Sequence, residues 1–266
     1  MESTEREATE KNSLSDLYTS GEYWDDHPDF LIGQAPNKVR FLMDFIDFDA
    51  IVKMLPNKML TIADIACGAG KVSTGIAEQL RERYPGYEIK VYGYDLSPQV
   101  IDVAKKLNTE GEFTCGDFKD AGMTWDLALL VDMIEHVPDP DEFLRDVAER
   151  SRCFVVGFAM DDNLASKLSK ARREVTYKVG HVSQFDEKRA LEVSGKCGKV
   201  LKTSYIANPL GRNLRIRRVL HLFTLLPRLL LQMLSRRVKG KIFGGESIYA
   251  FVESNCFSYV LPTKPQ

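Results

Sequence analysis

Short apolar runs alternate with segments of helical periodicity from residue 61 onward. Runs that read as buried strands lie at 61–66, 88–95, 111–116, 125–131, 153–158, 199–207 and 247–253. Apolar positions three to four residues apart predict helices at 72–84, 98–107 and 140–149. Continuous apolar strands that alternate with helices are typical of a parallel sheet covered on both faces. The pattern therefore predicts a doubly wound α/β fold with a mainly parallel, seven-stranded sheet.

The segments around this region follow different patterns. Residues 1–36 are polar and acid-rich at their start, and we expect a tail and a capping segment there. An amphipathic helix is expected at 39–48, inside a single domain that covers 37–266. Within that domain, a basic and apolar helical insertion is expected at about 209–246. Because the start lacks the basic and apolar run of a signal peptide, a cytoplasmic location is predicted.

Composition narrows the class of protein further. An apolar share of 44% provides enough side chains for a large core and excludes wholesale disorder. The five cysteines lie far apart and show no CxxC spacing; they are Cys67, Cys115, Cys153, Cys197 and Cys256. We therefore expect reduced thiols, with no disulfide framework and no metal site.

A glycine-rich turn connects the first predicted strand to the first helix. Gly68 and Gly70 can adopt positive φ and let a ligand approach the backbone, and the helix beyond them offers free N–H groups. A dinucleotide site usually has a third glycine, but Ser73 stands at that position. Asp64, at the end of the strand, suits a cationic group better than a diphosphate.

Carboxylates also follow the next three predicted strands. Asp95 ends the second strand, where a carboxylate can accept hydrogen bonds from both ribose hydroxyls of a nucleoside. Asp117 and Phe118 follow the third, where they can bond an adenine amino group and stack on the ring. Asp132 follows the fourth. Together these positions predict an adenosine-containing ligand at the carboxyl ends of the strands.

The stretch from about Leu60 to Phe158 resembles the class I S-adenosylmethionine-dependent methyltransferases. IADIACGAGKVS is similar to their glycine-rich first motif, VYGYDLSPQVIDVAKK to the ribose-binding second, and CGDF to the adenine-contacting third. DMIEHVPDPDEFL resembles the branch that includes the ubiquinone-biosynthesis O-methyltransferases. The resemblance implies a Rossmann-like sheet with an antiparallel last strand and S-adenosyl-L-methionine as cofactor.

The resemblance also implies which residues contact the cofactor. Asp64, Gly68 and Gly70 would line its amino-acid end. In the less familiar N-terminal part, Tyr23 and Lys38 are the residues expected to help close the site. The full expected set is Asp64, Ala66, Cys67, Gly68, Gly70, Asp95, Leu96, Asp117, Phe118, Asp132, Tyr23 and Lys38.

Methyl transfer to a small molecule, at a hydroxyl, is the predicted reaction, and the acceptor is a lipid, quinone, sugar or natural product. A hydroxyl acceptor needs a base. His136 is the first candidate and His181 the second, although a loop histidine often only bonds the backbone. Two alternatives remain open: a nicotinamide-dependent oxidoreductase, and a non-catalytic cofactor-binding partner subunit.

Residues 211–245 form the most unusual segment of the chain. They contain nine Lys or Arg and no Asp or Glu, whereas the rest carries 27 basic and 38 acidic residues, a net charge of −11. Their apolar stretch at 220–234 is too short to span a bilayer. A basic amphipathic helix on an anionic membrane surface fits. A lid or a homodimer contact is the alternative. Nucleic acid is not expected, because the basic residues are not interleaved with aromatic residues for base stacking.

Overall fold

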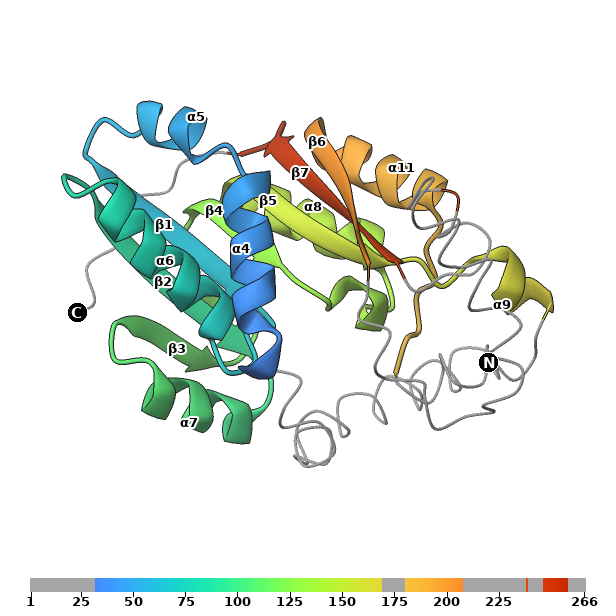
Figure 1. Cartoon of the computed structure of the whole chain (residues 1–266), viewed down its shortest axis with the longest axis horizontal. Helices are drawn as coiled ribbons and strands as arrows, with labels where there is room; N and C mark the ends of the chain where they lie inside the picture. Colours follow the sequence, from blue (N-terminus) through green and yellow to red (C-terminus); the bar gives the residue numbers. More distant parts are fainter. Residues whose placement is uncertain (1–31, 169–179, 208–237, 239–245, 258–266) are drawn as a thin grey trace. The chain divides into compact units, whose positions relative to one another are not determined.

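The computed structural model describes residues 32–168, 180–207, 238 and 246–257 (Figure 1). The predictions for Tyr23, for residues 1–31 and for nearly all of 211–245 lie outside these described residues. Within the described part, no helix is both long and apolar enough to cross a lipid bilayer.

A seven-stranded sheet with the strand order β3-β2-β1-β4-β5-β7-β6 organises the fold. The strands are β1 (Met59–Ile65), β2 (Glu88–Asp95), β3 (Gly111–Cys115), β4 (Trp125–Leu130), β5 (Ser151–Ala159), β6 (Gly198–Ala207) and β7 (Glu246–Ser254). β1 pairs in parallel with β2 and β4, and β2 pairs in parallel with β3. All seven strands were expected, each within two residues of its observed ends.

The last strand runs antiparallel to its neighbour β5. Met160 N–H donates to the carbonyl of Glu246 at 3.1 Å, and Gly157 lies against Tyr249, whose ring would be 2.6 Å from a Cβ at 157. Residue numbers therefore rise along β5 while they fall along β7. The predicted class, a mainly parallel Rossmann-like sheet with helices on both faces and an antiparallel last strand, is confirmed.

The helices agree with the sequence patterns, apart from three segments. They are α4 (Ala35–Phe45), α5 (Phe48–Lys53), α6 (Lys71–Arg83), α7 (Pro98–Leu107), α8 (Pro140–Arg150), α9 (Leu164–Leu168) and α11 (Glu187–Cys197). The helix predicted at 39–48 was wrong at its end. The chain leaves the helical conformation at Ile46, and Asp47 caps α5 by accepting a hydrogen bond from Ala50 N–H at 3.0 Å. α9 and α11 were not predicted.

The described residues fall into two compact units. The first lies within 1–131, 146–155 and 253–266, and the second within 132–145 and 156–252. In the first unit, α6 packs on β1 and β2, α4 packs on α6, and α7 packs on β2 and β3 (Figure 1). The chain winds from β1 outward to β3 and returns to β4 on the other side of β1. Such a switch point opens the ligand site of α/β sheets at the carboxyl ends of the strands.

Candidate functional site

The turn after β1 has the backbone conformation that its glycines predict. Gly68 has φ of 54° and Gly70 has φ of 69°, and Gly70 is the N-terminal cap of α6. Ala66 also lies in the left-handed region, at φ of 57°. For a residue with a Cβ this conformation costs about 1–2 kcal/mol. Strain of this kind is concentrated at binding sites, where the surrounding structure holds it in place.

The Phe113 ring fills the space that three glycines leave open beside this turn. A Cβ at Gly70 would lie 2.4 Å from the Phe113 ring, a Cβ at Gly93 also 2.4 Å, and one at Gly111 2.6 Å. Phe113 is 5% exposed and packs in one cluster with Cys67. The turn is therefore held tightly against β2 and β3, and a side chain at position 70 would displace it.

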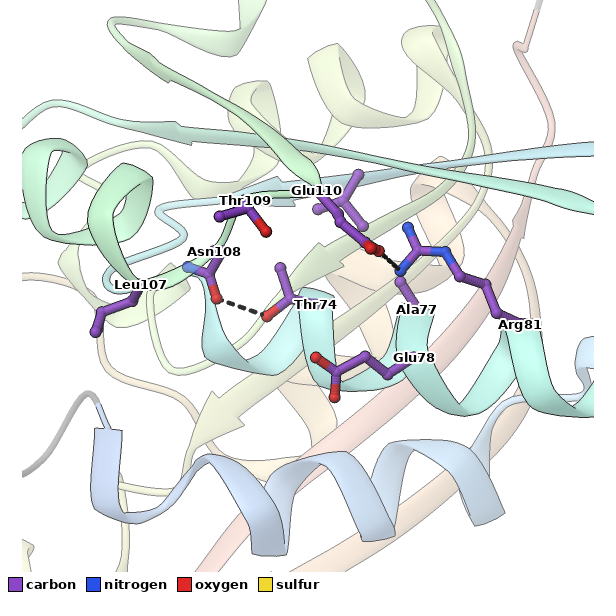
Figure 2. Close-up of a pocket in the computed structure, with 9 residues that line it drawn as sticks. Thr74, Ala77, Glu78, Arg81, Leu107, Asn108, Thr109 and Glu110 are labelled. Carbon is purple, nitrogen blue, oxygen red and sulfur yellow. Dashed lines mark hydrogen bonds and ion pairs between the residues drawn. The ribbon is translucent and has the colours of Figure 1, made fainter.

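Asn108 braces the same turn, and the sequence interpretation missed it. Its side-chain amide donates to the carbonyls of Ala69 at 2.8 Å and Ala104 at 2.7 Å, and its oxygen accepts from the Thr74 hydroxyl at 3.0 Å. Figure 2 shows the Thr74–Asn108 bond in the wall of a small pocket. An Asn directly after a predicted helix was the available signal, because such a residue often caps the helix end.

This pocket is a support for the turn rather than the predicted ligand site. Two of its charged residues, Arg81 and Glu110, already form an ion pair of 2.6 Å with each other (Figure 2). The residues that line it are Thr74, Ala77, Glu78, Arg81, Val91, Leu107, Asn108, Thr109 and Glu110. None of the predicted site residues is among them.

Asp95, at the end of β2, is held by the backbone on both carboxylate oxygens. Oδ2 accepts from Gly68 N–H and Oδ1 from Ser97 N–H, each at 3.0 Å. Burial raises the pKa of Asp95, while the bonds from Ser97, Gly68 and Leu96 oppose the rise. Each oxygen keeps a further lone pair, so the fixed carboxylate can accept two more hydrogen bonds. Beside it, Leu96 is an apolar side chain that is 50% exposed.

Asp64 is buried behind the turn. It is 3% exposed, and Ser73 Oγ donates to its Oδ2 at 2.5 Å. Burial raises the pKa of Asp64 to about 7, although the hydrogen bonds from Ser73 and the positive charge of Lys38 act in the opposite direction. The structure thus brings Lys38, a predicted site residue, into electrostatic reach of Asp64. Burial, together with the charges of Asp64 and Asp95, raises the pKa of the Cys67 thiol well above its usual value, which supports a packing role for Cys67.

Asp117 and Phe118, which follow β3, differ in how deeply they are buried. Asp117 is half-buried, accepts from Lys119 N–H at 3.0 Å and forms an ion pair with the Lys119 side chain at 3.3 Å. Phe118 is only 2% exposed, and its ring lies 6.4 Å from the ring of Trp125. A ring buried this deeply offers little free face to a base. The adenine-stacking role of Phe118 therefore stays a prediction, and the burial counts against it.

Both predicted histidines belong to the second unit, where they lie together. Their rings meet edge to face, with centroids 4.9 Å apart. His136 Nδ1 lies 3.0 Å from the Gly180 carbonyl, which can only accept, so this nitrogen carries the proton and Nε2 is the basic atom. Burial, and then the positive charge of His181, lowers the pKa of His136 to about 4.

The pKa of His181 is shifted in the opposite direction. Its Nδ1 forms a hydrogen bond with Oδ2 of Asp161. Burial disfavours the charged ring, but the hydrogen bond and charge of Asp161, with the charge of Glu135, outweigh it and raise the pKa of His181. Asp161 was missed by the sequence interpretation, because 20 residues separate it from its partner.

Glu135 and Asp132 complete this group, which comprises Asp132, Glu135, His136, Asp161 and His181. Asp132 follows β4, has φ of 55° and accepts from the Tyr249 hydroxyl at 3.1 Å. Glu135 is 4% exposed, and its Oε2 has no hydrogen-bond partner. Burial, followed by the charge of Asp132, raises the pKa of Glu135 to about 8. One ligand atom each of Glu135, His136 and His181 lies within 4.8 Å of the others.

The fold and the first unit together define a class of protein. A sheet of this strand order, with a glycine turn after β1 and a backbone-held carboxylate after β2, is a Rossmann-like sheet built to hold a nucleoside. Residues 63–152 match the family model described as a methyltransferase domain. This stretch of the chain is therefore similar to methyltransferase domains, and the resemblance to the class I S-adenosylmethionine-dependent methyltransferases is confirmed.

Individual relatives agree with this assignment. The chain is 27% identical over 132 residues to the ubiquinone biosynthesis O-methyltransferase of Xylella fastidiosa, a match that covers 46% of this chain and 47% of that protein. It is 30% identical over 126 residues to norajmaline N-methyltransferase of Rauvolfia serpentina. This match covers 43% of this chain and 40% of that protein. The matched part thus spans about half the length of the curated relatives or less.

A solved structure resembles the chain over most of its length. The magnesium protoporphyrin IX methyltransferase of Synechocystis PCC 6803, with S-adenosylhomocysteine bound, superposes with a TM-score of 0.53 at 15% identity. The likeness covers 92% of this chain and 99% of that one. At this identity it shows that the two chains share a fold.

Proposed function

We propose that this protein transfers the methyl group of S-adenosyl-L-methionine to a small-molecule acceptor, at a hydroxyl. One observation carries the proposal. The carboxylate of Asp95 is fixed by two backbone N–H groups beside the turn at Gly68, with lone pairs left for two hydroxyls. The methyltransferase-domain match over 63–152 supports the same conclusion. This match disfavours the nicotinamide enzyme, whereas the intact residues Asp64, Gly68 and Asp95 disfavour the non-catalytic subunit.

In this proposal, different residues of the first unit bind different parts of the cofactor. Asp95 accepts the ribose hydroxyls, and Leu96 offers its exposed apolar side chain to the base. Asp64 attracts the ammonium group of the methionine part, because an ionised carboxylate behind the turn is complementary to it. Gly68 and Gly70 let the cofactor approach the backbone. Methyl transfer is an in-line displacement, so holding donor and acceptor in this way supplies most of the catalysis.

The two predicted catalytic histidines are the groups assigned to the acceptor in this proposal. The lowered pKa keeps His136 neutral, so its Nε2 has a lone pair that can accept the proton of a hydroxyl while the hydroxyl oxygen attacks the methyl carbon. His181 is the second candidate base. The ubiquinone O-methyltransferase relative supports an oxygen acceptor. The alkaloid N-methyltransferase relative supports a nitrogen acceptor as the second candidate.

Calorimetric titration with S-adenosylmethionine, S-adenosylhomocysteine and NAD tests the cofactor. We expect micromolar binding of the two sulfur nucleosides and no binding of NAD. Asp95→Ala should weaken this binding at least about a hundredfold, because two charge-assisted hydrogen bonds are lost. Asp102→Ala removes an exposed carboxylate of α7 and should change nothing. Binding of NAD alone would move the chain to the oxidoreductases.

We also propose that the segment 211–245 brings the protein to an anionic membrane surface. Nine basic residues without an acidic one, together with a leucine-rich stretch, support this proposal. A surface contact would give the site access to an acceptor that is dissolved in lipid.

A further inference from the structure

The group around His136 and His181 has the composition of a metal site. We propose that Glu135, His136 and His181 bind one divalent transition-metal ion. The three residues offer two imidazole nitrogens and one carboxylate oxygen, all within 4.8 Å of one another. A set of two histidines and one carboxylate leaves coordination positions open for other ligands.

The distances require the donor atoms to move together by up to about 1.5 Å. Two donors that are each about 2.0–2.2 Å from one ion at a tetrahedral angle lie about 3.3–3.6 Å apart. The widest of the three separations is at most 4.8 Å. Side-chain rotations of Glu135 and the histidines can close this difference, while backbone hydrogen bonds hold the two segments together. The Glu135 carbonyl accepts from Val182 N–H at 2.9 Å and from Ser183 N–H at 3.0 Å.

The second argument comes from the hydrogen bonds that orient the two histidine rings. Metal-binding histidines almost always donate their other ring N–H to a carboxylate or a backbone carbonyl. His136 does so to the carbonyl of Gly180 at 3.0 Å, and His181 to the carboxylate of Asp161. In both rings Nδ1 carries the proton, so Nε2 is the nitrogen with the lone pair for a metal. Two neighbouring histidines that satisfy this condition are hard to explain by packing alone.

The third argument is an unsatisfied carboxylate. Glu135 is 4% exposed, and its Oε2 has no hydrogen-bond partner. Within the described part of the chain, no Lys or Arg forms an ion pair with Glu135 or Asp161. A buried polar atom without a partner costs about 1–3 kcal/mol, and more when it is charged. A divalent cation would remove this cost and balance the negative charge.

The ligand types also indicate which ion would bind. Imidazole nitrogens suit zinc, iron and other transition metals, whereas magnesium and calcium prefer oxygen ligands only. The sequence interpretation expected no metal site because it considered cysteine spacing. The proposed ligands contain no cysteine, and His181 lies far along the chain from Glu135 and His136, so no local pattern reveals the set.

The role of the ion deepens the proposed methyl transfer and therefore rests on it. An acceptor hydroxyl that occupies an open coordination position loses its proton more easily, because the cation lowers its pKa. The proton leaves to solvent, and the oxygen lone pair forms the new C–O bond. The sulfur–methyl bond breaks, and its electron pair stays on sulfur to give S-adenosylhomocysteine. With an ion bound, Nε2 of His136 is a ligand, and the ion replaces it in activating the hydroxyl.

Metal binding is measured on the untagged full chain after removal of metals by a chelator. Calorimetry with Zn²⁺ and with Mn²⁺ gives the stoichiometry and the Kd, and the visible spectrum of the Co²⁺ form reports its ligands. We expect one Zn²⁺ per chain with a micromolar or lower Kd. His136→Ala, His181→Ala and Glu135→Gln should each weaken binding at least about a hundredfold. Asp161→Asn acts through His181 and should weaken it about 10–100-fold.

Three controls separate this site from metal binding elsewhere on the chain and from loss of folding. Asp162→Asn removes the neighbouring carboxylate, which pairs with Lys167 at 3.0 Å, and should leave the Kd unchanged. The double variant Cys115→Ser, Cys256→Ser removes the two exposed thiols and should also bind Zn²⁺ normally. Circular dichroism and S-adenosylhomocysteine binding show whether each variant is folded.

The outcomes distinguish the two proposals. If no stoichiometric metal binds, or if His136→Ala and His181→Ala bind Zn²⁺ as tightly as the wild type, the metal site is wrong, whatever the cofactor titration gives. If Zn²⁺ binds and the variants lose it, but neither sulfur nucleoside binds, the metal site stands and the proposed methyl transfer fails.

Discussion

Asp64 and Asp95 are two carboxyl groups next to the same turn, and their surroundings give them different properties. Backbone N–H groups hold both oxygens of Asp95 in place and oppose the rise that burial causes in its pKa. Asp64 is buried with one hydroxyl partner, and its pKa is raised to about 7. At neutral pH Asp64 is therefore close to the point where it gains or loses its proton. A cationic ligand would favour the ionised form.

Cofactor affinity should consequently depend on pH through Asp64. The ammonium group binds the ionised carboxylate, so below pH 7 binding must first release a proton. The Kd for S-adenosylhomocysteine should weaken as the pH falls from 7.5 to 5.5, with a limiting slope of about tenfold per pH unit. Calorimetry at four pH values measures this slope. Asp64→Asn, which cannot titrate, should bind weakly and without this dependence, and a slope kept by that variant would contradict the assignment.

The contribution of Asp64 to protein stability depends on pH in the opposite direction. The folded pKa of Asp64 lies above the ordinary value of 3.8, so the folded chain holds the proton more tightly than the unfolded chain. The contribution of Asp64 to the free energy of unfolding is therefore greatest below pH 4 and falls as the pH rises to about 7. Asp64 thus stabilises the unliganded protein least at the pH where it would bind the cofactor best.

Residues of the first unit could be predicted because their chemistry is local in sequence. Asp64, Gly68 and Gly70 lie within seven positions of each other, and Asp95 ends a strand that its apolar neighbours predict. Asp161 could not be found in this way. An isolated Asp in a loop resembles any solvated acid, and only the folded chain brings it to His181.

Element boundaries were predictable where one property dominates a segment. β1 and β4 are apolar almost throughout, and β2 alternates between buried and more exposed positions. Ser97 with Pro98 marks the start of α7, where Ser97 accepts from Val100 N–H. α11 was missed because Ser194 and Gly195 interrupt its periodicity. Its start was nevertheless encoded, since Asp186 caps it by accepting from Arg189 N–H at 2.7 Å.

The junction of β1 and α6 depends on Gly70 for two separate reasons. Gly70→Ala places a Cβ 2.4 Å from the Phe113 ring and forces a residue with a side chain to φ of 69°. We expect the free energy of unfolding to fall by about 2–4 kcal/mol, from strain and overpacking together. Urea denaturation measures the change.

Gly86→Ala is the matched control for this substitution. Nothing lies within 4 Å of a Cβ at position 86, so a change within about 0.5 kcal/mol is expected there. A second variant, Phe113→Leu in the Gly70→Ala background, should recover the stability that is lost through crowding of the ring. The stability that is lost through the positive φ of residue 70 should not return. A Gly70→Ala protein as stable as the wild type would show that the turn is not held against Phe113.

At the scale of the whole molecule, charge is divided unevenly along the chain. Residues 211–245 are basic, and the remaining residues have a net charge of −11. Flotation with vesicles that contain anionic lipid should therefore recover the protein at low salt, and neutral vesicles should not. Each basic residue near the membrane surface contributes about 1 kcal/mol to the free energy of binding. Vesicle affinity should therefore fall up to about a thousandfold when four arginines are changed to Gln, namely Arg212, Arg215, Arg217 and Arg218.

High salt should release the wild type as well, because screening weakens the attraction between the basic segment and the lipid. A protein that stays in solution with anionic vesicles at low salt would exclude the membrane role and leave a lid or a dimer contact for this segment.

The chain between β5 and α11 is fastened at both of its ends. Met160 and Asp162 donate to the carbonyls of Glu246 and Phe185, while Val182 and Ser183 donate to the carbonyl of Glu135. These bonds use backbone groups, which every residue supplies except proline, which lacks the N–H. Evolution can therefore change the exposed side chain at Val182 and still keep His181 beside His136.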